Sequence, residues 1–196
     1  MRRLLSGLTA LVVVACAPAH PDGVPSGPGA LVVVYKAELG AGGAVQGRAK
    51  LSVWAAQPDR LHAEILTPVG GVAFLLDAGG GRVCIVDVDA GIAYAGEDGP
   101  GAIESLIGVR VSVSAAVAAL LHGTAPPALS VVRDGAEDGA LPASFRITDG
   151  ERFLSLSRVR VERGNADTRS LGTGTPASGL PLRPIERLAE DLAPRR

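Results

Sequence analysis

Aromatic residues are scarce in this sequence: they make up 3% of its 196 positions, although 47% of the positions are hydrophobic. A core built from this chain must therefore consist mostly of valine, leucine, isoleucine and alanine. Such small side chains leave two outcomes open. A covered sheet can be hollow enough to hold an apolar ligand, or the covering elements can pack closely onto the sheet and leave no space.

An excess of charge of one sign is also missing. The 19 Lys and Arg residues nearly balance the 20 Asp and Glu residues, which gives a net charge of -1. Proteins that bind nucleic acid present a basic face to the phosphates, and this composition provides no sign of one. We therefore expect no nucleic-acid partner, and the length suits one compact domain with tails.

Sequence signals for catalysis and metal binding are absent as well. No Gly-x-Ser-x-Gly motif occurs, and no Ser or Cys forms a nucleophile pair with a nearby His. The histidines share no ligand spacing; they are His20, His62 and His122. The segment 87–91 resembles a calcium loop only faintly, because Ile92 stands where such loops require Gly. We predict that the protein is not an enzyme and uses no cofactor or metal.

The apolar run at the start of the chain is too short to span a membrane. Leu4–Ala15 follows Arg2 and Arg3 and has twelve residues, whereas a spanning helix needs about 20. This pattern indicates a secretory signal. The run ends in Val-Val-Ala-Cys, which resembles the lipobox of bacterial lipoproteins. We expect residues 1–15 to be a signal peptide and Cys16 to be lipidated; the alternative is an ordinary signal peptide with an incidental cysteine.

The lipoprotein resemblance has consequences for localisation. One acyl chain gives only marginal membrane binding, but the resemblance implies three chains on Cys16 and a firm anchor. Ala17, rather than Asp, follows the cysteine, which by the sorting rule of such proteins implies the outer membrane. The Pro- and Gly-rich stretch 16–29 is a spacer. Cys84 lies in an apolar strand-like run, where a free cysteine is a small core residue.

Short alternating segments separated by turn residues dominate from residue 30 to residue 165. His62 lies on the polar face of one of them, which predicts a solvated histidine. Close spacing favours an antiparallel meander, because parallel crossovers need a dozen or more residues. The predicted strands are 31–38, 46–54, 60–66, 71–77, 82–87, 91–95, 127–133, 143–148 and 152–162.

Two amphipathic segments interrupt the strands. Residues 100–107 begin with Pro and end before Gly108, and a second helix begins at Ser112 or Ser114 and ends at His122-Gly123. Both place apolar residues on one face and predict a lid over the sheet. We expect residues 166–196 to be a flexible tail with a short terminal helix at 184–192, for which docking and mobility both remain open.

The order of these features resembles the LolB family, the outer-membrane lipoprotein receptors, and more broadly LolA/LolB-like proteins. The resemblance spans residues 46–126. Four segments carry it: the strand ending at Trp54 with the following Arg60-Leu61; Leu66-Thr67-Pro68-Val69-Gly70; Tyr94 with Glu97-Asp98 and Leu106-Ile107-Gly108; and Leu120-Leu121-His122-Gly123-Thr124-Ala125-Pro126.

The resemblance implies a mainly β fold: an open antiparallel half-barrel of about nine strands, with two short helices as the lid of a hydrophobic cavity. It implies binding of lipoprotein acyl chains or lipids, delivered by a periplasmic lipoprotein carrier, at the periplasmic side of the outer membrane. The candidate cavity and lid residues are Leu61, Ile65, Val72, Phe74, Ile103, Leu106, Ile107, Val113, Val117, Leu120 and Leu121.

A loop of these receptors exposes a Leu that contacts the membrane, and the corresponding segment here is Pro68, Val69 and Gly70. Exposure of Val69 and packing of Val69 under the sheet are both open. Because one scaffold hosts several functions, two alternatives remain. The first is an envelope lipoprotein of the same fold that transports nothing and binds a protein partner. The second is an envelope hydrolase, which requires polar groups in the cavity.

Overall fold

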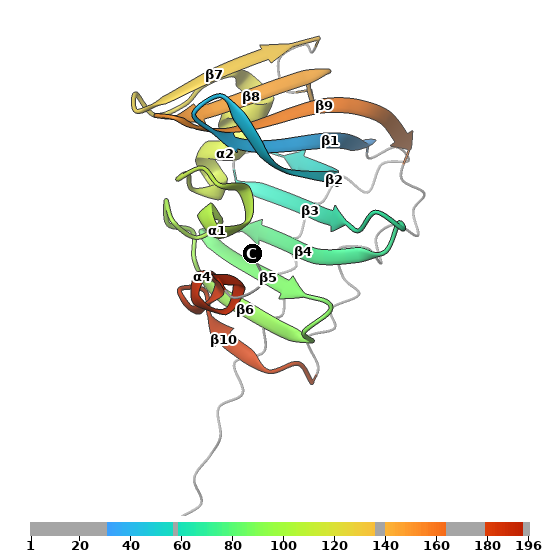
Figure 1. Ribbon diagram of the computed structural model, residues 1–196, viewed down its shortest axis with the longest axis vertical. Helices are drawn as coiled ribbons and strands as arrows, with labels where there is room; N and C mark the ends of the chain where they lie inside the picture. Colours follow the sequence, from blue (N-terminus) through green and yellow to red (C-terminus); the bar gives the residue numbers. More distant parts are fainter. Residues whose placement is uncertain (1–30, 57–58, 136–139, 164–178, 194–196) are drawn as a thin grey trace, which may run out of the picture.

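The computed structural model describes residues 31–56, 59–135, 140–163 and 179–193, which form one open sheet with short helices along one side (Figure 1). The signal peptide, Cys16 and the spacer expected at 16–29 lie outside these residues. The strands are β1 Leu31–Ala41, β2 Ala44–Ala56, β3 Arg60–Leu66, β4 Val72–Gly79, β5 Arg82–Asp87, β6 Ile92–Glu97, β7 Leu129–Asp134, β8 Ser144–Asp149, β9 Arg152–Arg163 and β10 Leu182–Pro184.

The sheet confirms the expected fold class. Its ten strands lie in the order β10-β6-β5-β4-β3-β2-β1-β9-β8-β7, and every pair is antiparallel except β10 with β6. The first nine strands correspond to the nine predicted ones. The sheet does not close on itself, so one apolar face must be covered by other elements.

Glycines make two of the tight turns of this meander. Gly80 and Gly81 connect β4 to β5 and have φ angles of 62° and 73°. Both central residues of such a hairpin turn need positive φ, which side chains other than Gly adopt at a cost. Gly42 and Gly43 make the same kind of turn between β1 and β2, with φ angles of 58° and 81°.

The strand register collects the core on one face of the sheet. Tyr35 is fully buried, and its hydroxyl donates a hydrogen bond of 2.7 Å to the Pro142 carbonyl, which satisfies its polar atom. A single row of directly paired, buried residues crosses six strands; it consists of Val33, Val53, Ala63, Leu76, Ile85 and Tyr94.

Three helices cover this face one after another, as Figure 1 shows: α2 (Val113–His122) near β2 and β3, α1 (Glu104–Ile107) in the middle, and α4 (Arg187–Leu192) beside β6. The expected first helix is shorter than predicted, because residues 100–103 form turns before α1 begins. The terminal stretch docks: its Leu188 is 0% exposed.

The turn glycines give a test of the fold. Ala at position 80 meets no atom within 4 Å but must adopt a φ of +62°, so we expect Gly80→Ala to lower the free energy of unfolding by about 1 kcal/mol. Gly99→Ala is the control, because that position also has open space and no positive φ. Urea unfolding measures both. Equal stabilities of the two variants would contradict the assigned turn.

Candidate functional site

The sequence between β6 and β7 forms the lid, residues 102–122, and short signals position it. Gly108 ends α1 with a φ of 74°, and its N–H donates to the Glu104 carbonyl at 2.8 Å. Ser112 caps α2 by accepting a 3.2 Å hydrogen bond from the Ala115 N–H. Gly108 thus confirms the predicted end of the first helix, and Ser112 confirms the predicted start of the second. Glu104 also pairs with Arg152 of β9, which ties α1 to the sheet.

Asp98, directly after β6, fastens the lid and was not predicted. Its Oδ1 accepts from the Val113 N–H at 2.5 Å and its Oδ2 from the Ser114 N–H at 2.9 Å. Both donors belong to the first turn of α2, where helix N–H groups lack partners and a negative charge is favourable. The two residues lie 15 and 16 positions downstream, so no local sequence pattern indicates this contact.

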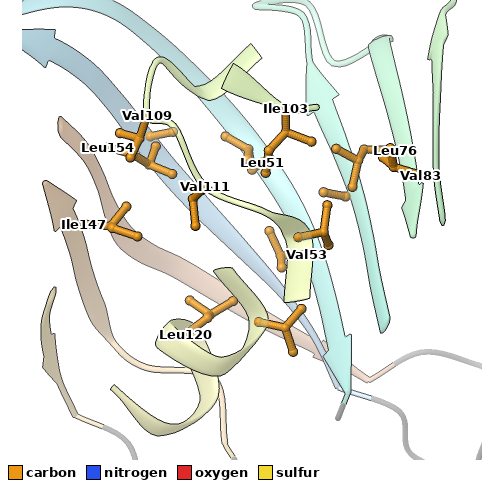
Figure 2. Close-up of a cluster of buried hydrophobic side chains, with 14 of the residues drawn as sticks. Leu51, Val53, Leu76, Val83, Ile103, Val109, Val111, Leu120, Ile147 and Leu154 are labelled. Atoms are coloured by element: carbon orange, nitrogen blue, oxygen red, sulfur yellow. The ribbon is translucent and has the colours of Figure 1, made fainter. Parts of the chain in front are cut away.

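The α2 half of the lid is sealed against the sheet. Val109 and Val113 are 0% exposed and Val117 is 1% exposed. A side chain that water cannot touch does not line a cavity wide enough for an acyl chain. Figure 2 shows the lid side chains Val109, Val111 and Leu120 facing strand side chains such as Val53, Ile147 and Leu154. In this half of the lid, the small side chains give close packing rather than a hollow.

The predicted cavity residues divide into two groups by burial. Buried ones come from α2 and from the turn before α1: Ile103, Val113, Val117, Leu120 and Leu121. Half-buried ones come from β3, β4 and α1: Leu61, Ile65, Val72, Phe74, Leu106 and Ile107. Their role in ligand binding stays a prediction. Val109 and Val111, in the link between α1 and α2, belong to the same buried cluster. The sequence did not predict them, because a link between two helices has no periodic pattern that indicates burial.

The loop between β3 and β4 exposes Val69 to solvent. Val69 is 94% exposed, and Pro68 and Gly70 beside it are also exposed. Thr67 closes the loop from within: its N–H donates to the Gly71 carbonyl at 2.7 Å and its hydroxyl accepts from the Gly71 N–H at 3.0 Å. Because the loop's own hydrogen bonds fix its shape, an apolar side chain remains in water at the tip.

His62 forms a charged cluster on the other face of the sheet, where a solvated histidine was predicted. The prediction was wrong, because the side chain is only 16% exposed. Its Nδ1 lies 2.7 Å from Asp77 Oδ1, and its Nε2 lies 3.6 Å from Glu64 Oε1. Burial lowers the pKa of His62, but the two carboxylates outweigh it and raise the pKa to about 9.

A depression of about 480 Å³ lies between the β4–β5 turn and the end of β6. It is lined by Gly80, Gly81, Arg82, Gly96, Glu97 and Asp98. Arg82 and Glu97 are directly paired across β5 and β6, and both Asp98 oxygens already bind α2. Asp98 therefore supports the lid from the rim of this depression.

Among the described residues, no cluster of three or more His, Cys, Asp or Glu side chains has the arrangement of a metal site. No helix in this part of the chain is both long and apolar enough to cross a membrane. Comparison with models of known protein families found no match for the chain, and a search of curated proteins found none either. The relation to LolA/LolB-like proteins thus remains a hypothesis based on the four sequence segments.

Asp98 provides a test of how the lid is fastened. We expect Asp98→Ala to lower the free energy of unfolding by about 1–2 kcal/mol, because two N–H groups of α2 lose their acceptor. Glu97→Ala is the matched control, since it removes the same charge from an exposed neighbour. Chemical denaturation measures both variants, and an Asp98→Ala protein as stable as the control would rule out the clamp.

His62 makes stability depend on pH. Its pKa is raised in the folded state from 6.5 to about 9, so its contribution is full below about pH 6.5 and is lost as the pH rises through 9. We expect the free energy of unfolding to fall over this window in the unmodified protein and to fall less in His62→Gln. Urea titrations across the window test this. If the unmodified protein became more stable relative to His62→Gln as the pH rises, this increase in the difference between their free energies of unfolding would contradict the assigned cluster.

Proposed function

We propose that this protein is a lipoprotein anchored in the outer membrane that binds acyl chains of lipoproteins or lipids and acts as their receptor or carrier. The observation that carries the proposal is Val69, which is 94% exposed at the tip of a loop closed by the Thr67–Gly71 hydrogen bonds. Entry of an exposed apolar side chain into a lipid surface is favourable, because it removes apolar area from water. Its position matches that of the membrane-contacting Leu in the receptors that the sequence resembles.

The covered sheet supports the same proposal. Its face offers apolar surface, and the short α1 with Leu106 and Ile107 leaves that surface half-covered near β3 and β4. An acyl chain needs such an apolar surface and no reactive groups. Binding requires part of the cover to move, because the region under α2 is sealed.

The expected N-terminus supports a membrane location. Lipid on Cys16 would anchor the chain, and the spacer 16–29 would separate the anchor from the sheet domain. A spacer of fourteen residues extended at about 3 Å each would reach about 40 Å. This length lets the domain turn its Val69 loop toward the bilayer and accept a ligand from a periplasmic lipoprotein carrier.

A second candidate function is binding of an envelope protein partner without lipid transport. The observation that favours it is the outer edge of β7. β7 ends the sheet order, and its Val132 is 62% exposed. An edge strand with an exposed apolar residue is a site where another strand can pair.

Val69→Glu separates ligand binding from membrane delivery. We expect the variant to take up a fluorescent fatty acid like the unmodified protein but to release it to liposomes about tenfold more slowly, which corresponds to ~1.4 kcal/mol. A carboxylate at the tip opposes entry into lipid. Stopped-flow fluorescence measures both steps.

Val132→Glu is the matched control, because it adds the same charge at another exposed valine. It should leave uptake and release unchanged. If the unmodified, folded protein takes up neither a fatty acid nor a lipoprotein, the receptor function is excluded. If Val132→Glu instead abolishes co-purification of a specific envelope protein, partner binding is the better account.

A further inference from the structure

We propose that Leu182–Leu192, here named the strap, is a displaceable cover that occupies in the ligand-free protein the place where an acyl chain binds. The strap consists of β10, Ile185, Glu186 and α4. The inference rests on the proposed function and names the binding site within it. Figure 1 shows the strap at the β6 end of the sheet, on the side that carries the lid.

The strap covers the end of the buried row that crosses the sheet. Tyr94, the last residue of that row, is 0% exposed, and its hydroxyl donates to Asp191 Oδ2 of α4 at 3.0 Å. Gly96, two residues further along β6, provides room for Ile185: a Cβ at position 96 would lie 2.4 Å from Ile185 Cγ2. The strap thus packs on a specific apolar site of β6 at Tyr94 and Gly96, here named the seat.

The strap fills this seat with aliphatic groups only. Ile185, Leu188 and Leu192 are 6%, 0% and 8% exposed, and their side chains together contain about a dozen aliphatic carbons. Polar side-chain contacts of the strap meet at Asp191, whose Oδ2 accepts from the Tyr94 hydroxyl at 3.0 Å and from Arg183 Nη1 at 2.6 Å. A fatty acyl chain has the same chemistry as the buried groups and a comparable number of carbons.

The strap is attached to the sheet by shorter elements than β1 and α2 are. β10 has three residues, all of them exposed, whereas β1 has eleven and pairs with strands on both sides. Pro184 has no N–H to donate to the sheet. α4 has six residues and no side-chain cap, and so short a helix is unstable without its tertiary contacts. In contrast, α2 is held by Asp98 and Ser112.

Displacement of the strap would therefore expose the β6 end of the apolar face while α2 stays in place. Opening free energies differ within a fold, and segments with few buried contacts and short hydrogen-bonded ladders open first. Only molecules with the strap displaced can bind the ligand. The observed affinity is therefore the affinity of these open molecules multiplied by the fraction of molecules that are open. It follows that a change which weakens the strap must tighten acyl binding, as long as the sheet remains folded.

Hydrogen exchange of the intact protein, with and without palmitate, tests the strap directly. The Ile185 N–H, which donates to the Ala95 carbonyl at 3.1 Å, and the Leu188 N–H, which donates to the Ile185 carbonyl at 3.0 Å, report on it. We expect both to exchange faster than amides of β1 and to exchange faster still with saturating palmitate. Protection that is equal to that of β1, or that palmitate leaves unchanged or increases, would overturn the proposal.

Gly96→Ala tests the seat, because the added Cβ pushes Ile185 away while the sheet face beneath it is retained. We expect its Kd for palmitate to fall at least threefold relative to the unmodified protein, with Gly99→Ala unchanged as the control. An unchanged or higher Kd for palmitate in a folded Gly96→Ala protein would overturn the strap proposal. The proposed function would still hold in that case, provided that the unmodified protein binds palmitate. If neither the unmodified protein nor any variant binds palmitate, the proposed function and the strap proposal are both wrong.

Discussion

An open sheet with one apolar face must cover that face with other parts of its own chain, and the rest of this structure depends on that requirement. Ten strands do not close on themselves, so the buried row from Val33 to Tyr94 would meet water without a cover. Three separate segments of the chain cover this face. α2 and the link with Val109 seal one half, the short α1 lies over the middle, and the strap covers the β6 end.

The attachment of this cover differs along the sheet, and the proposed displacement of the strap rests on that difference. Asp98 and Ser112 hold α2, whose Val113 and Val117 have almost no contact with water. The strap at the other end has a three-residue strand and a six-residue helix. A molecule with one permanent and one removable cover can bind an apolar ligand and still remain folded. Val69, held in water by the Thr67 hydrogen bonds, would mark the end that meets the bilayer.

The sequence allowed nine of the strands to be predicted because their signals are local: alternation within each strand and turns such as Gly80-Gly81 between them. β10 was missed because its exposed residues show no alternation and its partner β6 precedes it by about 90 positions. The same limit applies to Asp98, which caps a helix 15 residues away, and to His62, whose carboxylate partner Asp77 comes from the neighbouring strand. Composition permitted either a hollow or a tight lid, and only packing could decide between them.

The central claim is that an acyl chain binds in the seat of the strap rather than beneath α2. Intermolecular NOEs from carbon-13-labelled palmitate bound to the full protein test it most directly. The account predicts NOEs from the palmitate methylenes to the Tyr94 ring and the Gly96 α-protons, and none to Ile147 or Leu154 under the sealed lid (Figure 2). Saturable binding with NOEs to Ile147 and Leu154, and none to Tyr94, would contradict it.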